Sequence, residues 1–298
     1  MHETGHEKQL ISYWEQDCWD WRESIFAPHI CIIEAVTLVG KTASGLGNTR
    51  DDALQRCLSE TAEIMARRAL SSEPSKRVSV GQTGIAAHVD PEYAQLNALY
   101  EAHERVAIWQ WWLGQGSARK IPDGWLLLHG FTGWLDQKRA TAEIKRVTAL
   151  WSLTTTSDIH TVVCKSEYPN GQDPILGFGS SACVVDAARK ALRETLLMEL
   201  NLMEVLAVRS GYSTRDVSTI EAKIKNYALR CPAILPQDEV SLRKQALGNM
   251  RLKEVVSKAV CSPKFRDITP PDQYRVVWQC CIEGTSQLHA NGPAAPFM

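Results

Sequence analysis

Glutamates in closely spaced pairs are the residues of this chain best suited to chemistry. Three helix-like stretches carry them as Glu60 and Glu63, Glu101 and Glu104, and Glu194 and Glu199. Carboxylates at positions i and i+3, as in the first two stretches, lie on one face of a helix. Several such helices brought together would gather hard oxygen ligands, which Mg²⁺ binds, usually beside the phosphates of a substrate. The pattern therefore indicates nucleotide chemistry.

Glycine-rich segments precede two of the three stretches. The first follows Ser44 as Gly45 and Gly47, which predicts a turn, and the second spans residues 177–179. Backbone N–H groups in such loops can hold phosphates. Ser44, Gly45 and Gly47 are therefore predicted to bind the cofactor.

Each glutamate pair also has a structural explanation. Glu63 can pair with Arg67 at i+4, on a solvated helix face. Glu101 and Glu104 precede a run that is apolar around nearly the whole helix, which predicts burial. A buried charge needs a partner. Arg105 can supply part of the charge compensation. The rest can come either from a closed ion pair or from a metal with phosphate.

The third stretch repeats this argument. Glu194 stands among Leu197, Met198 and Val205, and Glu199 also points into apolar neighbours. Neither side chain is expected on a solvated face. Each can be structural or part of a site, and Glu199 is predicted to contribute to cofactor binding.

Hydrophobic periodicity gives the elements that must position these residues. Helices are expected at 51–70, 91–114, 137–151, 184–209, 215–229 and 239–259, and the stretch up to residue 22 can also be helical. Strands are expected at 25–39, 124–129, 160–165 and 274–282. Loops are expected at 71–89 and 168–181. Strands that alternate with helices indicate the α/β or α+β class. No exact repeat is visible, although the glutamate-bearing helices resemble one another.

Composition excludes several classes of protein. The chain has 298 residues, 44% of them hydrophobic, and a formal net charge of −1. This charge gives no reason to expect a nucleic-acid or membrane-surface partner. The polar start is no secretory signal, and the long apolar runs contain glutamates, so we expect a cytoplasmic protein without membrane spans. Nine cysteines without ligand spacing are expected to be buried thiols in a reducing compartment rather than a zinc site.

At these glutamates the chain resembles the YcaO family. The family's first signature, a glycine-rich turn, Thr and an Ala-rich helix with Glu-x-x-Glu, is matched by Gly45, Gly47, Thr49, Ala53, Glu60 and Glu63. The second, Glu-x-x-Glu-Arg followed by aromatics, is matched by Glu101, Glu104, Arg105, Trp111 and Trp112. The third, Gly-x-Gly and then Ala-Leu-x-Glu, is matched by Gly177, Gly179, Ala191, Leu192 and Glu194. The matches keep the family order and span residues 41–200.

The resemblance implies a YcaO-like fold with mixed sheets, packed helices and a glutamate-rich ATP cleft. It implies an enzyme that activates backbone amides of a ribosomally made precursor peptide at the expense of ATP. In such enzymes a nucleophile adds to the amide carbon, ATP phosphorylates the oxyanion, and phosphate leaves. Side chains of Cys, Ser or Thr give azolines (thiazole or oxazole precursors), as in bacteriocin-like peptide antibiotics. Sulfide gives a thioamide, and an amine gives an amidine.

The matched positions imply roles for individual residues. The residues that would hold Mg²⁺ and ATP are Glu60, Glu63, Glu101, Glu104 and Glu194. Arg105 would contact phosphate, and Glu101, Glu104, Arg105 and Glu194 would form the catalytic set.

The resemblance also bears on domains and partners. It suggests an N-terminal segment at 1–40, a YcaO-like domain at 41–290 and a proline-containing tail at 291–298, which either reaches the active site or is disordered. The partners implied are a separate leader-binding, E1-like or TfuA-like protein and a flavin dehydrogenase. The enzyme would be a homodimer or part of a hetero-oligomeric synthetase.

Some positions depart from the family pattern. Leu46 replaces the usual Lys, Leu197 replaces a Gln, and the segment between the first two signatures is short. These departures keep open a second hypothesis, a non-catalytic YcaO-like scaffold subunit of a modification complex.

Overall fold

The computed structural model describes residues 5–71, 83–154, 158–242, 251–258, 262–271, 273–282 and 296–297. It divides the chain into two compact units. The first unit is formed by Met1–Glu23, Ile30–Ala102 and Cys261–Gln287, and the second by Ser24–His29, His103–Val260 and Leu288–Met298. Both units combine helices with antiparallel sheets, so the predicted α+β class is confirmed.

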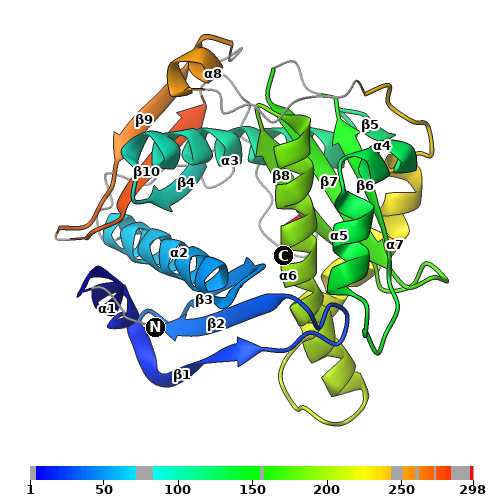
Figure 1. Ribbon diagram of the computed structural model, residues 1–298, viewed down its shortest axis with the longest axis horizontal. Helices are drawn as coiled ribbons and strands as arrows, with labels where there is room; N and C mark the ends of the chain where they lie inside the picture. The colour runs from blue at the N-terminus through cyan, green and yellow to red at the C-terminus, as the bar shows by residue number, and fades with distance from the viewer. Residues whose placement is uncertain are drawn as a thin grey trace. The chain divides into compact units, whose positions relative to one another are not determined.

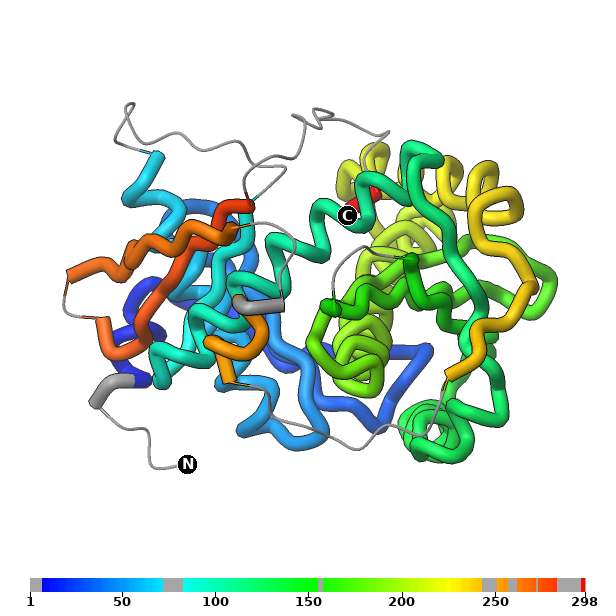
Figure 2. The backbone as a smooth tube through the Cα atoms, turned by 90° about the horizontal axis from the view of Figure 1, so that it is seen from above, coloured from blue at the N-terminus to red at the C-terminus, as the bar shows by residue number. Residues whose placement is uncertain are grey.

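The first unit contains two three-stranded sheets with the strand orders β1-β2-β3 and β4-β10-β9. Their strands are β1 (Trp14–Arg22), β2 (Cys31–Thr37), β3 (Thr42–Gly47), β4 (Thr83–His88), β9 (Pro263–Asp267) and β10 (Val276–Ile282). The helices are α1 (Gly5–Ile11), α2 (Arg50–Ser71) and the first part of α3 (Pro91–Trp112). β10 comes from the far end of the chain and pairs with both β4 and β9 (Figure 2). The central strand of the second sheet is therefore distant in sequence from β4.

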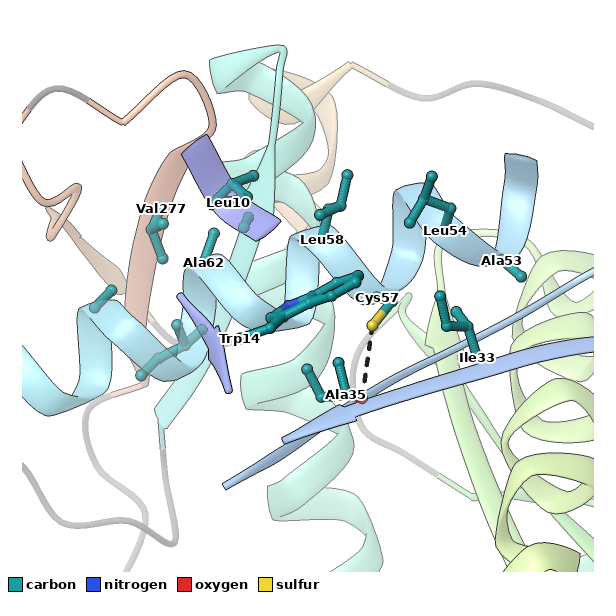
Figure 3. Close-up of a cluster of buried hydrophobic side chains, with 14 of the residues drawn as sticks. Leu10, Trp14, Ile33, Ala35, Ala53, Leu54, Cys57, Leu58, Ala62 and Val277 are labelled. Carbon is teal, nitrogen blue, oxygen red and sulfur yellow. Dashed lines mark hydrogen bonds between the residues drawn. The ribbon is translucent and has the colours of Figure 1, made fainter. Parts of the chain in front are cut away.

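Helix α2 forms the core of the first unit against β2 and β3. Apolar positions of α2 meet Ile33 and Ala35 of β2 (Figure 3). The indole N–H of Trp14 donates to the hydroxyl of Thr61 at 2.9 Å, which satisfies a buried donor. One face of α2 is thus fixed in the interior. Glu60 and Glu63 lie outside this apolar face and do not contribute to the core.

Glycine lets these strands approach the helices that follow them. A Cβ added at Gly45 would lie 1.9 Å from the carbonyl oxygen of Ala53 in α2, and one at Gly84 would lie 2.0 Å from that of Ala98 in α3. Real side chains do not tolerate such distances. The glycines therefore serve close strand–helix packing.

Gly45→Ala is expected to destabilise the protein by roughly 3 kcal/mol, because the helix backbone must move to admit the methyl group. Gly133→Ala is the control for the added methyl group, since apart from the adjoining residues of its own helix no atom lies within 4 Å of the Cβ position at Gly133. Urea unfolding of both variants checks this result. Equal stability of the two variants would contradict the packing role.

The second unit is built on a four-stranded sheet with the order β5-β6-β7-β8. Its strands are β5 (Ala118–Lys120), β6 (Val147–Leu153), β7 (His160–Glu167) and β8 (Ile175–Ser181). Its helices are the second part of α3, α4 (Asp123–Leu128), α5 (Phe131–Lys138), α6 (Val184–Arg209), α7 (Ser218–Ile234) and α8 (Leu252–Lys258). The long helix α6 runs along β8 and β7 (Figure 1). Gly177 and Gly179 of β8 permit this approach, as Gly45 does in the first unit.

Several predicted elements are confirmed. Helices α2, α3 and α6 and strands β2, β7 and β10 lie where the sequence predicts them. The later turns of α3 are buried as expected, including Trp109, Trp111 and Trp112. No described helix has the length and apolar character needed to cross a membrane.

Other predictions are wrong. The glycine-rich segments are the strands β3 and β8 rather than loops. The expected strand 124–129 is helix α4, and the later part of the expected helix 137–151 is strand β6. The polar N-terminal stretch is a short helix followed by strand β1, and β4 lies in a predicted loop. Part of the expected helix 239–259, at 243–250, and most of the loop 71–89, at 72–82, lie outside the described residues.

Candidate functional site

Three strand–helix units of this chain share one glutamate arrangement. The units are β3–α2, β4–α3 and β8–α6. In each unit a helix glutamate accepts a hydrogen bond from the backbone N–H located sixteen residues earlier, in the strand. The bonds are Ser44 N to Glu60 Oε2 at 2.7 Å, Ile85 N to Glu101 Oε2 at 2.8 Å, and Phe178 N to Glu194 Oε2 at 2.9 Å.

The strands explain why a carboxylate is needed at these points. Each of β3, β4 and β8 is the edge strand of its sheet. An edge strand presents N–H groups that no neighbouring strand satisfies. The charged acceptor supplies the missing bond, and charge-assisted bonds of this kind are strong. One oxygen of Glu60, Glu101 and Glu194 is therefore fixed in space by the backbone.

The helices share further positions in the same register. Small residues occupy the positions seven and three before each glutamate, and these are Ala53 and Cys57, Ala94 and Ala98, and Ala187 and Ala191. All six are fully buried. The resemblance between the glutamate-bearing helices is thus an internal repeat of the whole strand–helix unit.

The first unit brings four predicted site residues together. Ser44 donates to Glu60 from both its backbone nitrogen and its hydroxyl, at 2.7 and 3.0 Å. Glu63 Oε1 accepts from the nitrogen of Ala87 at 3.0 Å, so β4 holds Glu63 as well as Glu101. Two carboxylates on different helices are therefore fixed side by side on one strand edge.

Arg67 is the cation of this cluster. Its Nη2 lies 3.9 Å from Glu63 Oε2 and 3.6 Å from Glu101 Oε1. The pairing with Glu63 was predicted as an alternative to a site, and the contact with Glu101 was not. Arg67 also acts electrostatically on Glu60, so its guanidinium interacts with all three carboxylates, those of Glu60, Glu63 and Glu101.

Charge repulsion and burial disfavour full ionisation of the cluster. Burial, together with the charge of Glu101, raises the pKa of Glu63 to about 8. Burial also raises the pKa of Glu60, against the bonds from Ser44 and the charge of Arg67. A nearby cation stabilises the ionised form of such a carboxylate.

The metal-free protein is expected to lose stability as the pH rises from about 4.5 to about 8. In this window the folded state, with the pKa of Glu63 raised from 4.5 to about 8, binds more protons than the unfolded state. The free energy of unfolding must then fall with rising pH. Chemical unfolding at about pH 5.5 and about pH 8.5 checks this, with Glu63→Gln as the variant that should lose part of the dependence. An unchanged slope in Glu63→Gln would contradict it.

The donor set fits a Mg²⁺ ion that is shared with a ligand. Among the described residues, no group of three or more His, Cys, Asp or Glu side chains could hold a metal ion by itself. Mg²⁺ commonly takes one or two carboxylates and completes its shell with water and phosphate oxygens. The carboxylates of Glu60, Glu63 and Glu101 supply oxygens of this kind.

The second unit holds the remaining predicted residues, Glu104, Arg105, Glu194 and Glu199. Glu104 and Arg105 are half-buried on α3, and Glu194 is half-buried on α6. The guanidinium of Arg105 lies 5.4 Å from the ring centre of Phe297, and this ring lies 5.4 Å from that of Phe178. Phe178 is the residue whose N–H holds Glu194. Arg105 and Glu194 are thus linked through two aromatic rings.

The described tail residues are packed rather than disordered. Pro296 is buried, and its carbonyl accepts a hydrogen bond from the hydroxyl of Tyr227 at 2.6 Å. The ammonium of Lys223 donates to the carbonyl of Phe297. Pro296 and Phe297 therefore lie in the surroundings of Tyr227 and Arg105, and the course of the tail stays a prediction.

Glu199 lies in a closed ion cluster. Its Oε1 accepts from Arg139 Nη2 at 2.6 Å and from the Ser166 hydroxyl at 2.5 Å, and lies 3.5 Å from Arg146 Nε. The side chains of Glu199 and Arg146 are 0% exposed. A role in cofactor binding stays a prediction for Glu199, and this geometry supplies the structural alternative.

Sequence reasoning missed several contributors to the site. Gly45 and Gly47 were predicted to cradle phosphate from a loop, but they lie in β3 against α2, and the neighbouring Ser44 N–H bonds to Glu60. The contacts of Glu63 with β4 and of Phe297 with Arg105 join distant segments, for which the sequence carries no local signal. The constant spacing of small residues before Glu60, Glu101 and Glu194 was a signal for the repeat.

The family model of the YcaO cyclodehydratases, described as ATP- and Mg²⁺-binding, matches residues 70–259, more than half of the chain. The chain belongs to the YcaO family. The match contains the second and third signatures with Glu101, Glu104, Arg105 and Glu194, whereas the first signature lies before it. ATP and Mg²⁺ are the cofactors named for the family, which confirms the predicted pair.

Solved YcaO-type structures share the fold. The YcaO protein of Methanopyrus kandleri, bound with AMPPCP and Mg²⁺, aligns with a TM-score of 0.63 and 14% identity over 95% of this chain and 88% of that one. A heterocyclase in complex with substrate and cofactor aligns with a TM-score of 0.61 and 14% identity over 95% of this chain and 52% of that one, so this chain spans about half its length. A chain of the E. coli microcin synthetase McbBCD complex gives a TM-score of 0.57 and 13% identity over 88% and 86% of the two chains.

At these identities the likeness shows the fold alone. No curated protein matches the chain. The predicted family and YcaO-like fold are confirmed, and the reaction is a separate question.

Proposed function

We infer that this chain is an ATP-dependent enzyme that activates backbone amides in a ribosomally synthesised precursor peptide. The reaction we propose is cyclodehydration of Cys, Ser or Thr to azolines. The observation that carries this proposal is the repeated edge-strand bond to Glu60, Glu101 and Glu194. It holds one oxygen of each of these three family glutamates in place, within a family described as ATP- and Mg²⁺-binding.

Each group has a distinct task in this proposal. Glu60, Glu63 and Glu101 would hold Mg²⁺, and Arg105 would contact an ATP phosphate. Glu104 and Glu194 are further carboxylates that would hold metal-bound ATP. Bound Mg²⁺–ATP would supply the phosphoryl group that converts the amide oxygen into a leaving group. Preorganised charges of this kind are the main protein contribution to phosphoryl transfer.

The described end of the tail lies beside Arg105, the residue proposed to contact phosphate. Phe297 is half-buried against Trp109 and Phe178, with ring centres 6.4 and 5.4 Å away. Two solved structures with the same fold support a substrate complex and an assembly, since one heterocyclase is a complex with substrate and cofactor and the other is the McbBCD complex. We propose a precursor peptide as substrate and a separate partner protein that presents it.

One observation favours the non-catalytic scaffold as the second candidate. Leu46, where the family usually has Lys, is 4% exposed in β3. An aliphatic side chain buried there contributes no charge to a phosphate site. A subunit that binds peptide without ATP turnover would tolerate this residue.

Product analysis distinguishes the candidates. The protein would be incubated with Mg²⁺–ATP, a Cys- and Ser-containing precursor peptide encoded beside its gene and the neighbouring partner proteins. Loss of one water per modified residue with phosphate release supports the azoline reaction. Replacement of oxygen by sulfur indicates the thioamide reaction, and peptide binding without phosphate release or mass change indicates the scaffold.

A further inference from the structure

Arg67 occupies the position between two family glutamates in the first unit. Its Nη2 lies 3.9 Å from Glu63 Oε2 and 3.6 Å from Glu101 Oε1. Glu63 precedes Arg67 by one turn of α2, whereas Glu101 comes from α3. A single guanidinium thus bridges two helices through their carboxylates.

Strand β4 fixes the opposite oxygens of the same two carboxylates. Ala87 N holds Glu63 Oε1 at 3.0 Å, and Ile85 N holds Glu101 Oε2 at 2.8 Å. Alternate residues on one strand edge are about 6.6 Å apart. The second oxygens of both carboxylates are therefore directed to the same place, and the guanidinium of Arg67 lies there.

Arg67 is a cation shared by several carboxylates of this cluster. Glu60, Glu63 and Glu101 influence one another electrostatically, and Arg67 is the cation that acts on both Glu60 and Glu63. The side chain of Arg67 is 46% exposed, against 21% for Glu63 and 23% for Glu101. A half-exposed arginine is held weakly and can turn into solvent at little cost.

We propose that Arg67 is an exchangeable counter-ion, which holds Glu63 and Glu101 together in the metal-free protein and is displaced from them when Mg²⁺ binds. The inference rests on the proposed function, because it assigns the metal to these two carboxylates. Arg67 is a positioning residue in this account. It keeps two like charges at the spacing that the metal requires and makes metal binding an exchange of cations.

The test compares Arg67→Gln with the wild type in metal-free and metal-loaded forms. We expect a lower melting temperature for metal-free Arg67→Gln, because the two carboxylates then lose the guanidinium that lies between them. We also expect Mn²⁺, a spectroscopic substitute for Mg²⁺, to bind Arg67→Gln roughly 3- to 10-fold more tightly with AMPPCP present, as expected when weak competing ion pairs are removed. The increase in melting temperature on adding metal should be larger than in the wild type.

Arg68→Gln is the matched control, since Arg68 is the adjacent exposed arginine of α2. Its Mn²⁺ affinity should equal that of the wild type. Equal destabilisation of Arg67→Gln with and without metal, or weaker Mn²⁺ binding, would overturn the counter-ion role while leaving the metal site in place. Absence of Mn²⁺ binding by the wild type would instead overturn the proposed function, and the inference with it.

Discussion

Glu101→Gln is expected to lose metal-dependent nucleotide binding while its metal-free fold stays intact. Its amide oxygen can still accept the hydrogen bond from Ile85 N, so the bond between α3 and the edge of β4 is kept. The lost charge relieves repulsion with Glu63, whose pKa burial and Glu101 raise to about 8. The variant should therefore unfold at the same or a higher temperature than the wild type when no metal is present.

The loss of affinity should be large. Even groups that only support a metal ligand change affinity by roughly 10- to 100-fold when mutated, and a direct ligand should exceed this. Electron paramagnetic resonance of Mn²⁺ with AMPPCP measures the bound ion, and thermal unfolding measures the fold. Glu92→Gln, an exposed glutamate in the first turn of α3, is the control and should behave as the wild type. Unchanged Mn²⁺ binding in Glu101→Gln would remove this residue from the site.

Glu101→Gln should keep the stability of the fold. Glu199→Gln, in contrast, is expected to lower the free energy of unfolding by about 3–5 kcal/mol. It leaves Arg139 and the fully buried Arg146 without their counter-ion. Arg146 also donates to the carbonyl oxygens of Ser166 at 2.6 Å and Asp173 at 2.8 Å, so its position is fixed and it cannot turn toward water. Denaturant unfolding measures the loss.

Glu204→Gln on the same helix is the control for this prediction. Glu204 lies 3.6 Å from Arg215, whose side chain is 66% exposed, and such surface pairs contribute at most about 1 kcal/mol. A stable Glu199→Gln that no longer binds nucleotide would show instead that Glu199 belongs to the cofactor site, as the sequence suggests.

The sequence predicts the long helices well because their periodicity is strong. Helix α6 begins and ends where expected, and α3 is buried on nearly all sides. Short apolar runs are harder, because periodicity does not separate a short strand from one helical turn or two. For this reason the segment of helix α4 was predicted to be a strand, and the segment of strand β6 was predicted to be part of a helix.

The glycine-rich strands show a second limit. Gly45 and Gly177 resemble turn residues locally, yet each is required because a helix backbone lies against it. That helix is visible only in the folded chain. The same holds for Glu199, whose partners Arg139 and Arg146 are remote in sequence. The candidate glutamates could be named from the sequence. The sequence did not show which of them accept hydrogen bonds from an edge strand and which lies in a buried ion cluster.

Calorimetric titration of the wild-type protein with AMPPCP, in the presence and absence of Mg²⁺, tests the central claim most directly. The claim is that the edge-held glutamates of the first unit, Glu60, Glu63 and Glu101, form a metal–nucleotide site. We predict binding with one nucleotide per chain that requires Mg²⁺ and is lost in Glu101→Gln. Absence of binding by folded protein in both conditions, or binding that Mg²⁺ and Glu101→Gln leave unchanged, would contradict the claim.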